Sequence, residues 1–204
     1  DDIIATLAQE ACERGAKVTI VSSDKDLMQL VNEQITMFDA MKNRIIGIEQ
    51  VIEKFGVRPE KVIEVQALAG DSSDNVPGVA GIGIKTAAQL LNEYGDLETL
   101  LDRATEIKQP KRRESLINHA KIARISKKLV TLRNDVPLDQ ELSDLAVKQP
   151  HIEKLHSFLE EQGFKSLIAS LATSGKAPYQ EDSYNQSKAI VPNLMVLNSL
   201  VINI

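Results

Sequence analysis

The sequence predicts an α/β fold, in which a small and mostly parallel sheet with flanking helices precedes a purely helical subdomain. A β-branched segment at 17–22 follows an amphipathic helical segment, as expected for a buried parallel strand. Two more strand-like segments lie at 35–39 and 44–48. Beyond them, apolar residues recur at helical spacing as far as residue 172.

The composition is that of a folded domain with an aliphatic core. Of the 204 residues, 43% are hydrophobic but only 3% are aromatic, and there is no Trp. A net charge of −5 argues against a uniformly basic coat, although a local basic face remains compatible with it. The single cysteine, Cys12, excludes an internal disulfide and suits a reducing cytosol. Because no segment resembles a signal peptide or a membrane span, we expect a cytoplasmic protein without a membrane partner.

The first part of the chain alternates helices and strands. A helix is expected over 1–15, with Gly15 as its stop, and Asp26 leads into a second helix that starts at Leu27. The strands at 35–39 and 44–48 are joined by a short turn. Helix 49–55 ends at Gly56, and Pro59 opens helix 60–68 at a position where proline is tolerated.

The second part is expected to be helical, with segments at 85–94, 96–104 and 111–133 and two more helices within 151–172. The buried stripe of the long helix is predicted to comprise Leu116, Ile117, Ala120, Ile122, Ala123, Ile125, Leu129 and Leu132. This pattern predicts two domains, 1–58 and 59–172. Residues 173–193 have the polar composition of a linker. The β-prone end, 194–204, suits the first strand of a following domain; alone it would be disordered, exchanged between chains or paired on an exposed edge.

Three pairs of carboxylates mark the ends of predicted elements: Asp1/Asp2, Asp24/Asp26 and Asp71/Asp74. Any single pair is explained as well by helix capping as by ligand binding. Six carboxylates gathered in one place would repel one another unless cations neutralised them. Two Mg²⁺ ions about 3.5–4 Å apart are a common solution in nucleases.

A glycine-spaced loop follows the third acidic pair and runs directly into a helix. Gly78, Gly81 and Gly83 precede Lys85 and Thr86. Glycines let backbone N–H groups approach a phosphate, and the helix N-terminus adds favourable partial positive charge. A metal site beside a phosphate site points to nucleic acid as the partner. Further along lies a basic segment whose charges are explained equally well as a solvated face: Lys108, Lys111, Arg112, Arg113, Lys121, Arg124, Lys127, Lys128 and Arg133.

Four stretches together carry a resemblance to a known family. They are Asp1-Asp2-Ile3-Ile4, Ser23-Asp24-Lys25-Asp26, Gly70-Asp71-Ser72-Ser73-Asp74-Asn75-Val76-Pro77-Gly78-Val79 and Gly81-Ile82-Gly83-Ile84-Lys85-Thr86-Ala87. In order and spacing they resemble the 5′ nuclease family, most closely the N-terminal 5′→3′ exonuclease domains of bacterial DNA polymerases I. The similarity extends from Asp1 to about Ala172.

The resemblance implies a PIN-like 5′ nuclease core followed by a helix-three-turn-helix element at about 67–94. It also implies a two-metal phosphodiester hydrolase of DNA repair and primer removal, with Mg²⁺ or Mn²⁺ as cofactor and K⁺ in the glycine loop. Its partners would be duplex DNA with a nick or 5′ flap and the polymerase domain of the same parent chain. The metal ligands would be Asp1, Asp2, Asp24, Asp26, Asp71 and Asp74. The DNA contacts would come from Gly78, Gly81, Gly83, Lys85 and Thr86.

Two departures from the family pattern modify this expectation. The first acidic motif of the family is Glu-Ala-Asp-Asp, and this chain begins at its third residue, so we expect a truncated sheet and an incomplete metal site. Nuclease activity of this piece should then be weak or absent although it binds duplex DNA. The second departure is minor, since Ser23 stands where the family often has glycine.

Two other functions remain in view. The segment Gly70–Asp74 also resembles the last acidic motif of haloacid-dehalogenase-type phosphatases, but that motif normally follows a strand, and 62–68 has a helical pattern. A non-catalytic, helix-hairpin-helix-like DNA-binding module would explain residues 76–133 but would leave the three acidic pairs without a role.

Overall fold

The N-terminal part of the chain builds one side of a sheet. This computed structural model describes residues 1–147, 150–174, 194–197 and 200–203. Helix α1 (Asp2–Glu13) buries its apolar face and ends before Gly15, whose φ of +84° breaks the helix. Strand β1 (Lys17–Val21) then pairs in parallel with β2 (Ile35–Asp39), and β2 pairs antiparallel with β3 (Arg44–Ile46).

The other edge of β1 is covered by a hairpin from the end of the chain. Strands β4 (Leu194–Leu197) and β5 (Leu200–Asn203) pair antiparallel, and β5 pairs antiparallel with β1, with Lys17 opposite Asn203. The described strand order is β3-β2-β1-β5-β4. The sheet was expected to be mostly parallel, but only the β1–β2 pair is parallel among the described strands. The predicted linker 173–193 falls almost wholly outside the described residues.

Short helices connect the sheet to the helical part. The helix expected after Asp26 is only a 3₁₀ turn, η1 (Asp26–Leu30), because Val31 already has extended backbone angles. Helix α2 (Ile48–Phe55) ends at Gly56, which has the left-handed conformation typical of a helix stop. Pro59 opens the 3₁₀ turn η2 (Pro59–Lys61), which continues into α3 (Val62–Ala69).

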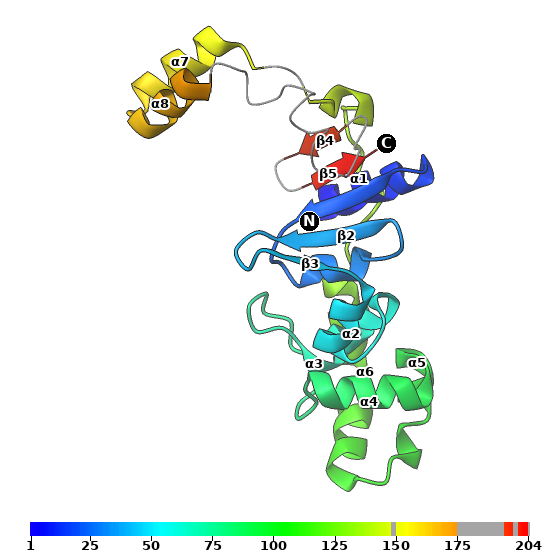
Figure 1. Ribbon diagram of the computed structural model, residues 1–204. Coiled ribbons are helices and arrows are strands. Elements are labelled where there is room, and N and C mark those ends of the chain that lie inside the picture. Colours follow the sequence, from blue (N-terminus) through cyan, green and yellow to red (C-terminus); the bar gives the residue numbers. More distant parts are fainter. Residues whose placement is uncertain (148–149, 175–193, 198–199, 204) are drawn as a thin grey trace.

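The helical part lies at the opposite end of the molecule from β4 and β5 (Figure 1). It comprises α4 (Ile84–Tyr94), α5 (Leu97–Asp102), the turn η3 (Ala104–Glu106) and the long α6 (Pro110–Val130). After the turn η4 (Leu142–Leu145), α7 (Ile152–Glu161) and α8 (Lys165–Ser174) form a hairpin that lies apart from α4–α6 in Figure 1. No described helix combines the length and apolarity that crossing a membrane requires.

The buried face of α6 differs from the predicted stripe. Leu116 and Ala123 are buried as expected, but Ile117, Ile125 and Leu129 are 46–61% exposed. The sequence offers apolar residues on more than one side of this helix, so their spacing alone could not identify the core-facing side. The helix also ends at Val130 rather than Arg133, because Thr131 is extended.

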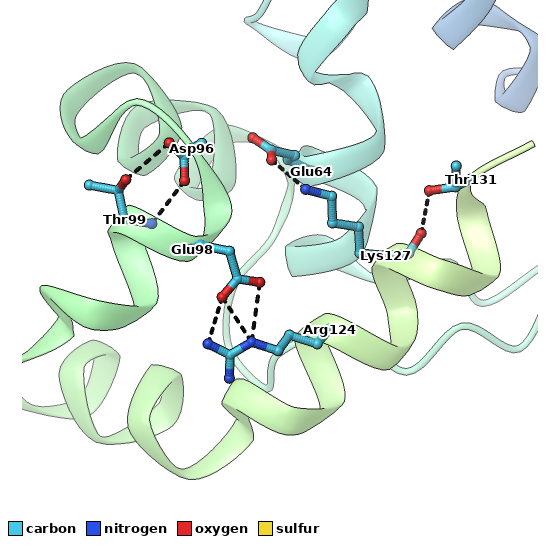
Figure 2. A network of polar contacts seen from close by, with 7 residues as sticks. All are labelled: Glu64, Asp96, Glu98, Thr99, Arg124, Lys127 and Thr131. Carbon is cyan, nitrogen blue, oxygen red and sulfur yellow. Dashed lines mark hydrogen bonds and ion pairs between the residues drawn. The ribbon is translucent and has the colours of Figure 1, made fainter.

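Helix α3 is buried on nearly all sides and packs against α4 and α6. One of its two buried polar residues, Glu64, accepts a hydrogen bond from Nζ of Lys127 on α6 at 2.8 Å. Figure 2 shows this pair beside a second link, in which Arg124 donates to both carboxylate oxygens of Glu98 on α5. Arg124 and Lys127 are thus paired with carboxylates of the same protein. At these two positions the basic segment links α6 to α5 and to α3.

Substitutions of two neighbouring lysines, Lys127 and Lys128, test whether the link between α6 and α3 stabilises the fold. In Lys127→Ala the carboxylate of Glu64, whose side chain is 12% exposed, loses its charged partner, so we expect a loss of about 1–3 kcal/mol in the free energy of unfolding. Lys128→Ala removes the same charge from an exposed position and should change stability by less than about 0.5 kcal/mol. Urea unfolding of both variants makes the comparison. Equal effects would show that Glu64 does not depend on Lys127.

Candidate metal centre

The turn between β1 and η1 places the second acidic pair. Leu27 and Met28 are buried and anchor η1 against the core. Ahead of them, Oδ1 of Asp24 accepts a hydrogen bond from the backbone N–H of Asp26 at 3.0 Å. This bond shapes the turn, and it engages one oxygen of Asp24 locally.

The third acidic pair lies on a tight turn at the end of α3. Asp71 and Val76 exchange two backbone hydrogen bonds of 2.8 and 2.7 Å, and Asn75 closes the turn with a φ of +57°. Gly78 packs so closely on Gly70 that a Cβ at Gly78 would lie 2.3 Å from the backbone nitrogen of Gly70. Only glycine permits this approach, and it fixes the acidic turn to the C-terminus of α3.

Together these two turns bring Asp26, Asp71 and Asp74 into one group. Their carboxylates each offer an oxygen within 4.8 Å of the others. Asp71 is buried and Asp74 is exposed, so the group opens towards solvent on one side. Several carboxylate oxygens at this spacing are the donor set that a hard divalent cation such as Mg²⁺ or Mn²⁺ prefers.

The surroundings of Asp26 are unfavourable for a negative charge. Burial raises the pKa of Asp26, and repulsion from Asp24, Asp71 and Asp74 adds to the increase. A hydrogen bond from Nε2 of Gln66 on α3 to Oδ1 of Asp26 opposes it. Gln66 is 3% exposed, and its Oε1 has no hydrogen-bond partner among the described residues. A buried acceptor beside an acidic group fits a site that receives a hydrated cation.

Asp71 is held by one ion pair and one hydrogen bond. Nζ of Lys25 lies 2.6 Å from its Oδ2, and the backbone N–H of Ser73 donates to its Oδ1 at 2.9 Å. Burial alone would raise the pKa of Asp71, but the Lys25 ammonium and the Ser73 donor outweigh it, so this pKa is lowered. These two contacts therefore favour the ionised form of Asp71.

The structure does not bring the first acidic pair into this group. Oδ1 of Asp2 accepts a hydrogen bond from the backbone N–H of Arg133 at 3.0 Å, and Asp1 is an exposed N-cap. Of the six predicted ligands, three thus converge within the described residues. The metal role of the six residues remains a prediction.

The glycine loop divides into a structural and an accessible part. The N–H of Gly78 already donates to Oγ of Ser126 on α6, whereas Gly81 and Gly83 are exposed with open space around them. Gly83 is the N-cap of α4 and provides no side-chain cap for the first amides of that helix. Lys85 is exposed and Thr86 half-buried in the first turn. The accessible part therefore suits the predicted phosphate contact better than Gly78 does.

Three residues around these features were not predicted: Lys25, Gln66 and Ser126. Lys25 lies between two aspartates in the sequence, and this position could have indicated a counter-ion. Gln66 is a polar residue inside the buried run of α3. Ser126 lies on the α6 face that the apolar pattern left undetermined, so its contact with Gly78 required the structure.

Asp26→Asn tests the electrostatics of the group, since the amide keeps an oxygen that accepts from Gln66 but removes the charge. A raised carboxyl pKa means that the wild type loses stability as the pH rises through that pKa. In chelator near pH 7, we expect the variant to melt about 2 °C above the wild type. The difference should vanish as the pH falls towards ~4. Divalent cations should stabilise the variant less than the wild type. A variant that melts lower in chelator would contradict the assignment.

The two parts of the chain match two known family models. Residues 1–56 match the model of the 5′-3′ exonuclease, N-terminal resolvase-like domain, and residues 57–153 match that of the 5′-3′ exonuclease, C-terminal SAM fold. The DNA polymerase I of Rhizobium leguminosarum is 59% identical over 172 residues, which are 84% of this chain and 17% of that protein. A 5′-3′ exonuclease of Aquifex aeolicus is 39% identical over 170 residues, which are 82% of this chain and 57% of that protein.

A solved structure shows the same fold. A mutant of the T5 5′-exonuclease superposes with a TM-score of 0.59 at 24% identity, covering 63% of this chain and 53% of the other. The chain spans about a fifth of the length of the DNA polymerase I relatives that it matches. The expected fold class, a 5′ nuclease core followed by a helical subdomain, is thus confirmed. The chain belongs to the 5′-3′ exonuclease family, with the resolvase-like domain in residues 1–56 and the SAM fold in residues 57–153.

Proposed function

We propose that this chain is the metal-holding and DNA-gripping part of a 5′→3′ exonuclease or flap endonuclease that hydrolyses phosphodiesters in DNA. The observation that carries the proposal is the convergence of Asp26 with Asp71 and Asp74, which lie on a turn that leads to the exposed N-terminus of α4. One segment of chain thereby supplies two of the three clustered carboxylates and the proposed phosphate site. The helix N-terminus favours the backbone of a nucleic acid through its unbonded amides.

The donor set fits Mg²⁺ or Mn²⁺, because it offers carboxylate oxygens only. Asp26, Asp71 and Asp74, with Asp24 beside them, would hold one such ion, and Asp1 and Asp2 would contribute to a second. When bound, the cation supplies stabilisation of the charge that develops on the scissile phosphate. Solved T5 relatives give general support, since one is a flap endonuclease complex with DNA and metal ions and another carries zinc.

The glycine loop and α4 would position the duplex. Gly81 and Gly83 would present backbone N–H groups to a phosphate, and Lys85 and Thr86 would contact the same strand. Gly78 would act through the loop that it holds in place. A K⁺ ion would bind other carbonyls of the loop, because the carbonyl of Ala80 already accepts from Ser115.

The substrate would be duplex DNA with a nick or a 5′ flap, as arises in repair and primer removal in the bacterial cytosol. The kinship with DNA polymerases I supports a polymerase domain as the partner in a longer parent chain. A second candidate, a non-catalytic DNA-binding module, is favoured by one observation: only three of the six predicted ligands converge within the described residues. For this chain we therefore expect duplex binding with weak cleavage or none.

A binding and cleavage assay separates the two candidates. The chain is titrated with nicked and 5′-flapped duplexes over a salt series, with Mg²⁺ or with chelator, and the products are run on a gel. Binding that weakens steeply with salt is expected, because phosphate contacts release counter-ions. Mg²⁺-dependent cleavage would establish the nuclease in this chain, whereas tight binding without cleavage would favour the DNA-binding module. A folded chain that fails to bind at low salt would contradict both.

Lys85→Ala tests the phosphate site. Loss of one phosphate contact should weaken binding of every duplex sequence and reduce the slope of log K against log salt by about 1. Lys154→Ala is the matched control, because it removes the same charge from an exposed position on α7, far from α4 (Figure 1). An unchanged salt slope in Lys85→Ala would show that the loop does not grip the backbone.

A further inference from the structure

Lys25 connects the two segments that carry the clustered carboxylates. It directly precedes η1 as its N-cap, and its Nζ lies 2.6 Å from Oδ2 of Asp71 on the acidic turn. The side chain of Lys25 is one-third exposed and that of Asp71 is 4% exposed. The ammonium therefore sits at the mouth of the carboxylate group and reaches a buried oxygen inside it.

This contact provides the positive charge that the group needs. Asp26, Asp71 and Asp74 lie close enough to repel one another strongly. Among the described side chains, the one that donates to the carboxylate of Asp26 is the neutral amide of Gln66. Among the described ion pairs, the one that reaches the group comes from Lys25. In the metal-free chain, the ammonium of Lys25 thus supplies positive charge that a metal ion would otherwise bring.

Both oxygens of Asp71 are engaged, Oδ1 by the N–H of Ser73 and Oδ2 by Lys25. We propose that Lys25 is a built-in counter-ion of the metal centre, and that a divalent cation must displace its ammonium from Asp71 in order to bind. The inference rests on the metal centre of the proposed function and adds a residue that regulates its affinity. Lys25 acts as a positioning residue, which keeps the acidic turn folded against η1 until the metal arrives.

The proposal predicts effects of opposite sign from one substitution. Lys25→Met keeps an unbranched side chain of similar length without the charge. In chelator it should melt several degrees below the wild type, because the carboxylates lose their counter-ion. It should also bind Mn²⁺ about three- to tenfold more tightly, because no ammonium competes for Asp71. Lys25→Arg, which keeps a cation, should recover most of the metal-free stability.

Lys42→Met is the matched control. Nζ of Lys42 lies 3.5 Å from Oδ2 of Asp39, a buried carboxylate outside the group. This variant also removes a lysine charge from a buried aspartate. Its affinity for Mn²⁺ should stay within about twofold of that of the wild type.

Calorimetric titration with Mn²⁺ and melting curves in chelator and Mn²⁺ measure both effects on the full chain. Displacement itself is followed by the NMR signal of the Lys25 ammonium, assigned by its absence from Lys25→Met, which should shift or vanish when Mg²⁺ is added. A signal that persists at saturating Mg²⁺, or Mn²⁺ affinity in Lys25→Met no higher than in the wild type, would overturn the inference and leave the metal centre standing. If neither protein binds Mn²⁺, the proposed metal centre is wrong and the inference falls with it.

Discussion

The burial of α3 is the constraint on which the rest of the structure depends. This eight-residue helix is enclosed by apolar contacts, yet it carries Glu64 and Gln66 two positions apart, which places them on nearly opposite sides of the helix. Glu64 pairs with Lys127 and so fixes α6. Gln66 holds Asp26 and so fixes η1. Because a buried polar group without a partner is costly, each contact ties a neighbouring element to α3 in one arrangement.

The turn that carries Asp71 and Asp74 is positioned by its contacts with the C-terminal end of α3. The N–H of Val79 donates to the carbonyl of Leu68 at 2.8 Å, and the backbones of Gly78 and Gly70 pack closely together. Asp71 and Asp74 therefore lie on a turn whose two ends are held together, and the N–H of Gly78 also donates to Ser126 of α6. The same few residues deliver the chain to the start of α4. The turn that carries Asp71 and Asp74 thus also leads the chain to the N-terminus of α4.

The sequence predicted where helices and strands lie better than it predicted which of their sides are buried and how the strands pair. The helices ended by Gly15 and Gly56 and the strands 17–21 and 35–39 carry local signals, so their places followed from periodicity and stop residues. The exposed side of α6 and the pairing of β5 with β1 depend on contacts between distant segments, which no local pattern encodes. For the site, acidic pairs pointed to Asp26, Asp71 and Asp74, but the role of Lys25 follows from a distance that only the folded chain defines.

The central claim is that Asp26, Asp71 and Asp74 hold a divalent cation at the C-terminal end of α3. The most direct measurement is anomalous diffraction from a crystal of the chain grown with Mn²⁺. We predict a Mn²⁺ peak within coordination distance of these three carboxylates, with the Lys25 ammonium moved away from Asp71. A Mn²⁺ ion bound at another place, or no ion at this group in a crystal that holds Mn²⁺ elsewhere, would contradict it.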